Sequence, residues 1–429
     1  MIKDIVLVTI REVNLLYLNM PKVLVGMSGG VDSSVAAYLL KERGYEVEGL
    51  SLILWEERKT TDFKTCCSLQ AVEEASETAH HIGITHSVLD VRDDFIEKVI
   101  EPFVNAYTTG LTPNPCILCN KFIKFPLLMK EAEKRGAEYI ATGHYARVEP
   151  AQSIEHGTQS KNNFSTFNVQ GSTKDPELKN LSLVTRHSLL KKGIDAKKDQ
   201  SYVLYILKPE ELKKIILPLG NYRKDEVREI AKRLNLPAAK RAESQEVCFV
   251  EDRNYFKFIE KLSPLVGKPG PIIDMAGKVI GTHKGIHAYT VGQRKRLGIS
   301  SKEPIYVVQI DALRNTVYVG TQEAAKKKEF SVEDLNWVLL PPAENFKVTV
   351  KVRSMMKAVP ANVFLLRSGN LHVAGKEQVI YASRIIHQMS GEIVRLVFDE
   401  PQWAPASGQS AVFYNGDTVI GGGVIKILA

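Results

Sequence analysis

Residues 26–34 combine glycine and serine in a way that can hold phosphate groups. They follow the apolar run at 22–25 and precede another apolar run, so the order predicts a strand, a turn and a helix. Glycines let the backbone approach a ligand closely, and N–H groups at a helix start attract anions. Ser33 or Ser34 is expected to cap the helix. The stretch predicts a pyrophosphate cradle, although it is neither a Walker loop nor the dinucleotide pattern, and the plainer alternative is a turn without a ligand.

The five cysteines are the other residues whose side chains can carry a reaction. Cys116 and Cys119 form a Cys-x-x-Cys pair, expected in a proline-containing turn before a helix, where a thiol ionises more readily. The spacing fits a redox pair, half of a metal site, or a nucleophile with a helper. Cys248 stands alone in an apolar stretch, so packing and chemical roles are both open. Cys66 and Cys67 are adjacent, a poor spacing for a zinc pair, and are expected to be dispensable.

The composition bounds the class of protein. The 429 residues are 44% hydrophobic and 25% charged, which predicts a globular chain of two or three domains. A net charge of +8 suits a polyanionic partner such as nucleic acid. Five cysteines are too few for a disulfide scaffold and no apolar run approaches a membrane span, so we expect a cytoplasmic protein without membrane contact. Residues 1–20 make a poor signal peptide, and Met20 is an alternative start.

Strands and helices must position these groups, and the first part of the chain alternates between them. Besides the strand that precedes Gly26, strands are expected at 46–54, 87–91 and 139–142, and helices at 68–82, 93–107 and 121–135. Such alternation predicts an α/β domain with a parallel, doubly wound sheet, whose ligand lies beyond the carboxyl ends of the strands.

The rest of the chain has a different texture. Residues 151–180 are polar, which predicts a flexible insertion. A strand at 181–185 and a basic helix at 222–236 follow, and short strands and glycine turns dominate after about residue 255. We therefore expect an N-terminal extension at 1–20, an α/β domain at 21–250 that contains the insertion, a small central β domain at 251–305 and a C-terminal β-barrel at 306–429.

Several short blocks can be read together. They are the block at 26–33, Asn114-Pro115 with Cys119-Asn120, the block at 141–145, the block at 198–202, Ser244-Gln245 with Cys248-Phe249, Tyr289-Thr290 with the block at 292–295, and Pro405 with the block at 408–414. In this order they resemble the tRNA-specific 2-thiouridylases (MnmA type), which belong to the PP-loop ATP pyrophosphatase superfamily. The resemblance runs from about residue 22 to the C-terminus and leaves out the insertion at 151–180.

The resemblance implies ATP-dependent chemistry on tRNA. The C2 oxygen of the wobble uridine would be adenylated, and a persulfide sulfur would then displace AMP to leave 2-thiouridine. Cys248 matches the cysteine that carries the persulfide, and Cys119 matches the nucleophile that releases the sulfur. A persulfide donor, such as a cysteine desulfurase or a relay protein, is the second partner implied.

The same resemblance assigns binding residues by position. The positions that match contacts to ATP, used with Mg²⁺, are Gly26, Met27, Ser28, Gly29, Gly30, Val31, Asp32, Ser33, Leu52 and Gly143. The positions that match contacts to tRNA are Asn114, Pro115, Cys116, His144, Lys198, Asp199, Gln200, Arg353, Ser354 and Gln409. Two of them depart from the family pattern: Cys116 stands where many members have an acid that is a candidate base, and Ser354 where an aromatic residue is common.

Alternatives remain open at this level. The fold also suits a PP-loop amide synthetase or a lysine-adding tRNA ligase, and the C-terminal part suits a non-catalytic RNA-binding protein. An iron–sulfur cluster held by Cys116, Cys119 and Cys248 would be a different route to the same thiolation. The basic runs near Lys198, in the helix that begins after Asn221 and at residues 294–296 bind phosphates or are ordinary solvated surface, and we favour phosphate binding.

Overall fold

The computed structural model describes residues 20–55, 69–150, 188–240, 247–250, 254–263, 267–366 and 392–427. The extension at 1–19, most of the predicted first segment, lies outside this set. So do the insertion predicted at 151–180, the strand predicted at 181–185, Cys66, Cys67, Ser244 and Gln245.

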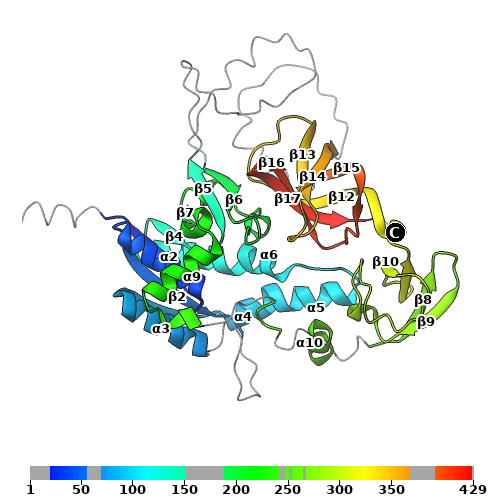
Figure 1. Ribbon diagram of the computed structural model, residues 1–429, viewed down its shortest axis with the longest axis horizontal. Helices are drawn as coiled ribbons and strands as arrows, with labels where there is room; N and C mark the ends of the chain where they lie inside the picture. The colour runs from blue at the N-terminus through cyan, green and yellow to red at the C-terminus, as the bar shows by residue number, and fades with distance from the viewer. Residues whose placement is uncertain are drawn as a thin grey trace, which may run out of the picture.

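A five-stranded parallel sheet forms the N-terminal α/β domain (Figure 1). Its order is β3-β2-β1-β4-β7, with β1 at Lys22–Gly26, β2 at Glu46–Ile53, β3 at Thr85–Asp90, β4 at Tyr139–Ala141 and β7 at Ile215–Ile216. Every pairing among these strands is parallel. The doubly wound sheet predicted from the alternating pattern is therefore confirmed.

Helices cover both faces of this sheet. Successive side chains of β1 point to opposite faces, so each face packs against its own set of helices. Val23 and Val25 pack against α2 (Val31–Glu42), α3 (Leu69–Ile82) and α9 (Lys224–Arg233). Leu24, between them, packs on the other side with residues of α7 (Phe125–Lys134). β1 is thus buried on both faces, as an apolar run of a central parallel strand predicts.

Two long helical segments contain π-helical turns. The first consists of α4 (Arg92–Phe95), a π-turn at Ile96–Ile100 and α5 (Glu101–Thr108), which leads towards the small β unit (Figure 1). The second consists of α6 (Pro115–Cys119), a π-turn at Asn120–Lys124 and α7. The Cys-x-x-Cys pair was expected in a turn before the helix, and this was wrong: the helix starts at Pro115, because Asn114 caps it, and both cysteines lie inside it.

A small β unit follows, after α8 (Pro209–Leu212) and α10 (Tyr255–Leu262). Its sheet order is β10-β11-β8-β9, with β8 at Gly270–Asp274, β9 at Val279–His283, β10 at Tyr306–Asp311 and β11 at Thr316–Gly320. β11 pairs with β8, so residues 306–320 share a sheet with residues from the central part of the chain. We therefore propose a domain boundary near Gly320 in place of residue 305.

Six strands close into the predicted C-terminal barrel. They are β12 (Lys326–Trp337), β13 (Asn345–Lys351), β14 (Val359–Leu366), β15 (Ile393–Trp403), β16 (Ser410–Asn415) and β17 (Thr418–Lys426). The ring closes because β12 pairs with both β15 and β17. A hairpin of the α/β domain, β5 (Ala146–Pro150) and β6 (Ser188–Lys192), extends the barrel sheet where Lys191 pairs with Thr418.

Hydrogen bonds of Ser410 and Asn336 are among those that fix the barrel against the α/β domain. The Tyr202 hydroxyl donates to the Ser410 carbonyl oxygen at 2.8 Å, and the hydroxyls of Tyr205 and Ser410 lie 3.1 Å apart. The Asn336 amide donates to the Tyr205 carbonyl oxygen at 2.6 Å. Around them, buried tyrosines of the α/β domain share one apolar core with Val412 and Tyr414 of the barrel, so the two units are packed as one body here. None of the helices in the described ranges has the length and apolarity that a bilayer span requires.

Candidate nucleotide and thiol site

The glycine loop (residues 26–34) is closed by its own polar groups. The Ser33 hydroxyl accepts from the Ser28 backbone N–H at 3.1 Å and donates to the Gly30 carbonyl oxygen at 3.2 Å. The Ser34 hydroxyl donates to the same carbonyl at 2.9 Å. The helix begins at Val31 and neither serine caps it, so that expectation was wrong: both lie in the first turn and bond backwards. The backbone around Ser28 is thereby held in a fixed curve.

Glycine is required at two points where this loop meets other elements. Gly29 has φ +70°, and a Cβ there would lie 2.2 Å from the Ala71 carbonyl oxygen. A Cβ on Gly143, just after β4, would lie 2.8 Å from the backbone of Asp32 and Ser33. The structure therefore brings the predicted ATP residue Gly143 against the loop. Leu52 lies on the neighbouring strand β2, partly buried in the core.

Asp32 has two partners that sequence reasoning did not assign to the nucleotide site. Its carboxylate accepts from the Lys224 ammonium group at 2.6 and 2.8 Å and from the Tyr145 hydroxyl at 2.7 Å. Lys224 is the first residue of α9 and was considered only as part of a basic run. Its position in the first turn, before the exposed basic residues of the helix, is the one sequence signal that sets it apart.

His144 is a buried, uncharged group next to the loop. Its Nδ1 lies 2.8 Å from the Thr142 hydroxyl, and its ring stacks on Phe125 with centroids 5.9 Å apart. Burial, helped by the positive charge of Lys124, lowers the pKa of His144 to about 3. The side chain is therefore neutral at pH 7 and can act only as a neutral donor or acceptor.

The segment around residue 200, predicted to contact tRNA, is hydrogen-bonded to Tyr145 and Lys224, two residues that bind Asp32 of the glycine loop. Gln200 and Tyr145 exchange two bonds, from the Tyr145 N–H to the Gln200 side-chain oxygen at 2.9 Å and from the Gln200 N–H to the Tyr145 carbonyl at 2.8 Å. The Asp195 carboxylate accepts from the Lys224 N–H at 3.0 Å. Two short routes therefore connect this segment to Asp32.

The Asp199 carboxylate is bound by other groups of the protein. Its carboxylate accepts from the Ser201 N–H at 3.1 Å and forms an ion pair with Lys351 of the barrel at 3.0 Å. The Asp199 side chain is only 3% exposed, so it holds the segment in place from inside, whereas Lys198 beside it is partly exposed.

The three described cysteines have different surroundings. Cys116 is exposed, Cys119 is buried and Cys248 is half-buried. The Asn114 side chain accepts from the Cys116 N–H at 3.1 Å, which caps the helix that starts at Pro115. Cys119 and Cys248 belong to one apolar cluster. Sequence spacing could not predict this, because the two thiols come from separate parts of the chain.

An iron–sulfur cluster or a bound metal would need several ligands close together. In the ranges that the structure describes, which include Cys116, Cys119 and Cys248, no group of three His, Cys, Asp or Glu side chains is arranged to hold a metal ion. The described residues therefore offer no ready site for a single metal ion, and the cluster considered above stays a prediction. Asp32 and Ser33 carry oxygens of the type that Mg²⁺ prefers, at the place where the loop would meet phosphates.

Two predicted tRNA residues of the barrel make hydrogen bonds inside the protein. Arg353 is largely buried and donates at 2.9 Å to the carbonyl oxygens of Val291 and Ala404, so it ties the small β unit to the barrel. Gln409 donates to the Thr112 carbonyl oxygen at 2.9 Å. Ser354, next to Arg353, is half-buried.

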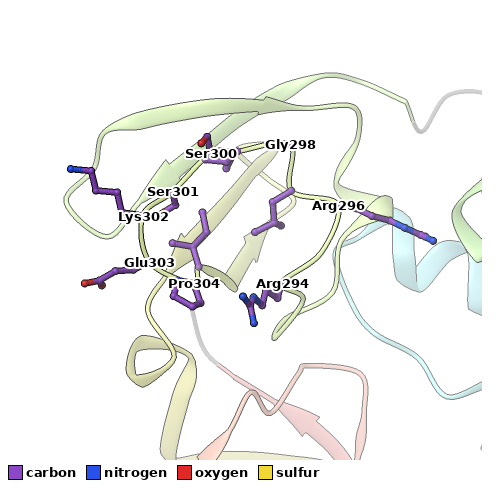
Figure 2. Close-up of a pocket in the computed structure, with 11 residues that line it drawn as sticks. Arg294, Arg296, Gly298, Ser300, Ser301, Lys302, Glu303 and Pro304 are labelled. Atoms are coloured by element: carbon purple, nitrogen blue, oxygen red, sulfur yellow. The ribbon is translucent and has the colours of Figure 1, made fainter.

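A separate cavity of about 510 Å³ lies in the small β unit (Figure 2), and none of its lining residues belongs to the glycine loop. Arg294, Arg296 and Lys302 contribute to its lining, together with Glu303. The charged ends of Arg294 and Arg296 point in different directions, and Lys302 points outwards (Figure 2). This arrangement suits a dispersed basic surface better than a site for one small anion.

Comparison with known proteins places the chain among tRNA-modifying enzymes. The family described as "tRNA methyl transferase HUP domain" matches residues 21–252, "tRNA methyl transferase PRC-barrel domain" matches 257–321, and "Aminomethyltransferase beta-barrel domain" matches 374–425. A tRNA-specific 2-thiouridylase MnmA of Clostridioides difficile is 40% identical over 407 residues, covering 94% of this chain and 98% of its own length. One from Halothermothrix orenii is 42% identical over 410 residues, covering 95% and 99%.

Proposed function

The chain belongs to the tRNA-specific 2-thiouridylase (MnmA) family of tRNA sulfurtransferases, and from this premise we propose that it thiolates the wobble uridine of tRNA in two steps, adenylation and sulfur transfer. The observation that carries the proposal is that the chain has both a glycine loop and two cysteines, distant in sequence, that the fold brings into one cluster. Cys119 and Cys248 share one apolar cluster, and the Asn114 cap and Cys116 begin the helix that carries Cys119.

In the first step the C2 oxygen of the uridine attacks the α-phosphorus of ATP. A bond forms between that oxygen and phosphorus, and pyrophosphate leaves. A urea-like carbonyl oxygen is a poor leaving group, whereas adenylate is a good one. The backbone N–H groups of the glycine loop and the start of α2 suit the departing pyrophosphate, and Lys224 adds positive charge at the same place.

In the second step the terminal sulfur of a persulfide on Cys248 attacks C2, and AMP leaves. The Cys119 thiolate then attacks the Cys248 sulfur. The sulfur–sulfur bond breaks, the sulfur stays on the base, and a Cys119–Cys248 disulfide forms, which a thiol reductant reverses. Their common cluster supports this pairing. The persulfide comes from an external donor, a cysteine desulfurase or a relay protein.

The assigned binding residues remain part of the proposal. Asn114, Pro115 and Cys116 would face the target base from the start of the helix. His144, Lys198 and Gln200 would contact the tRNA beside them. Neutral His144 would do so by hydrogen bonding, because it carries no charge at pH 7.

Two measurements on one reaction test the proposal. Substrate tRNA, ATP and a donor loaded with radioactive sulfur should give labelled tRNA, with pyrophosphate released in the same amount. Cys248→Ser and Cys119→Ser should abolish labelling but leave pyrophosphate release measurable, because adenylation needs neither thiol. Pyrophosphate release without labelled tRNA in the wild type would favour a different PP-loop ligation instead.

A further inference from the structure

We propose that Gln409 of the barrel is a positioning residue for the cysteine helix α6, and that its amide sets where that helix starts. The family resemblance assigns this position to tRNA contact. The inference goes beyond the proposed function, because it concerns how the barrel holds a helix of another domain.

The segment before the cysteine helix cannot satisfy its own hydrogen bonds. Pro113 and Pro115 lack backbone N–H groups, so the stretch at 112–115 has only two donors. The carbonyl oxygens of Thr112 and Pro113 precede the helix, and helical bonds cannot reach them. Thr112 is nevertheless buried, at 6% exposure, so its backbone needs partners from elsewhere.

The barrel supplies these partners from a three-residue stretch. The Ser407 carbonyl oxygen accepts from the Thr112 N–H at 2.9 Å. The Gln409 side-chain amide donates to the Thr112 carbonyl oxygen at 2.9 Å and to the Pro113 carbonyl oxygen at 3.4 Å. Gly408, between them, has φ +90°, and a Cβ there would lie 3.1 Å from the Thr112 nitrogen. The contact is therefore close as well as polar.

This stretch of the barrel is itself fixed. The Gly408 N–H donates to the Ile425 carbonyl oxygen at 3.0 Å, and the Ile425 N–H donates to the Gln409 carbonyl oxygen at 2.7 Å. The next residue, Ser410, is held by Tyr202 and Tyr205 of the α/β domain. Gln409 therefore acts from a rigid base, which a positioning residue requires.

The position of Asn114 connects this contact to the chemistry. Asn114 follows Pro113 directly and caps the helix, so a shift of the Thr112–Pro113 backbone moves the cap, Cys116 and the register of Cys119. The block of barrel residues that contains Pro405, Gly408 and Gln409 therefore has a structural role, because it holds the backbone that precedes the cysteine helix.

Gln409→Glu and Gln409→Met test the inference, since the first keeps the shape without a donor and the second keeps the length without polarity. The first readout is the alkylation rate of Cys119 with iodoacetamide, mapped by mass spectrometry and compared with that of exposed Cys116. We expect a rise of about fivefold in both variants, as the loss of one hydrogen bond implies. Ser407→Ala is the control, because the Ser407 hydroxyl accepts from the Ile427 N–H within the barrel and the substitution keeps the backbone carbonyl that binds Thr112.

The second readout separates positioning from tRNA contact. Positioning predicts that kcat for thiolation falls about tenfold, while the dissociation constants of tRNA and ATP stay within about twofold. Unchanged alkylation of Cys119, with a higher dissociation constant for tRNA alone, would overturn the inference and leave Gln409 as a tRNA ligand. The alkylation measurement needs no turnover, so it remains decisive even if the proposed reaction is wrong.

Discussion

The Asp32 carboxylate of the glycine loop binds the Lys224 ammonium group through both oxygens, at 2.6 and 2.8 Å. Asp32 lies in the first turn of α2 and Lys224 in the first turn of α9, so two helices direct opposite charges to one point. The Lys224 side chain is 13% exposed, which makes it a shielded cation beside the place proposed for pyrophosphate.

Replacing Lys224 with Met should impair ATP use without affecting tRNA binding. The shielded positive charge next to the loop would be lost, and we expect pyrophosphate release to fall by about 100-fold, as for other removed electrostatic groups. The measurement is tRNA-dependent pyrophosphate release, with tRNA affinity from filter binding. Lys232→Met is the matched control, because Lys232 lies exposed on the same helix. Equal losses in both variants would assign the effect to general charge.

Ser33→Ala should abolish adenylation and slightly destabilise the protein. The hydroxyl closes the glycine loop by accepting from the Ser28 N–H, and losing one such bond lowers the free energy of unfolding by about 1 kcal/mol. Asp32→Ala should likewise stop adenylation, with tRNA binding nearly intact in both variants. Chemical denaturation and pyrophosphate release measure the two effects. Wild-type turnover in either variant would remove the loop from the mechanism.

The cysteines should differ in importance according to their burial. Cys116→Ser should retain partial thiolation, since Cys116 is exposed and lies outside the proposed disulfide pair. Cys119→Ser and Cys248→Ser should lose it completely. Labelled sulfur in tRNA is the measurement. Equal losses in all three variants, with iron retained by the anaerobically purified protein, would instead favour a cluster.

Affinity for tRNA should fall steeply as salt concentration rises, because phosphate contacts release counterions. Lys198→Glu and Arg223→Glu should each weaken binding to every substrate tRNA, by amounts that shrink at high salt. Lys328→Glu, at an exposed lysine of the barrel strand β12, is the control. A flat salt response would show that these basic runs are solvated surface.

Acid should destabilise the protein partly through His144. Its pKa is lowered to about 3 in the folded protein and is near 6.5 when unfolded, so between these values the unfolded chain binds more protons and stability falls as pH falls. Between pH 7 and pH 5 this group should contribute a loss of about 2 kcal/mol in the free energy of unfolding. The free energy of unfolding of His144→Gln should fall by about 2 kcal/mol less than that of the wild type over the same range. Urea denaturation at each pH measures the difference.

The sequence predicted features that depend on local pattern. The alternation of apolar runs identified β1, β2 and β3 and the helices between them. The signal is clearest for β1, because a strand buried on both faces leaves a continuous apolar run. Patterns that depend on caps and turns were less informative. Ser33 had the residue type of a cap but lies inside the helix, and Asn114, two residues before Cys116, proved to be the cap of the cysteine helix.

The contacts between distant segments could not be predicted from local pattern. Lys224 and Asp32 are far apart in the chain, and only the packing of α9 against α2 brings them together. The same holds for Gln409 and Thr112, whose bond spans two domains. The resemblance identified Arg353 and Asp199 by their place in the sequence but could not show what surrounds them. In the structure Arg353 donates to a backbone carbonyl oxygen and Asp199 pairs with Lys351.

The Tyr202–Ser410 hydrogen bond can form only late in synthesis, after the barrel has been made. These residues are 208 positions apart, and at about 5–20 residues per second a bacterial or eukaryotic ribosome needs roughly 10–40 s to make the chain between them. During that interval the apolar surface around Tyr202 lacks its partners Val412 and Tyr414. The α/β domain therefore emerges with an incomplete core, and a nascent chain stalled before residue 410 should be a substrate for chaperones and proteases.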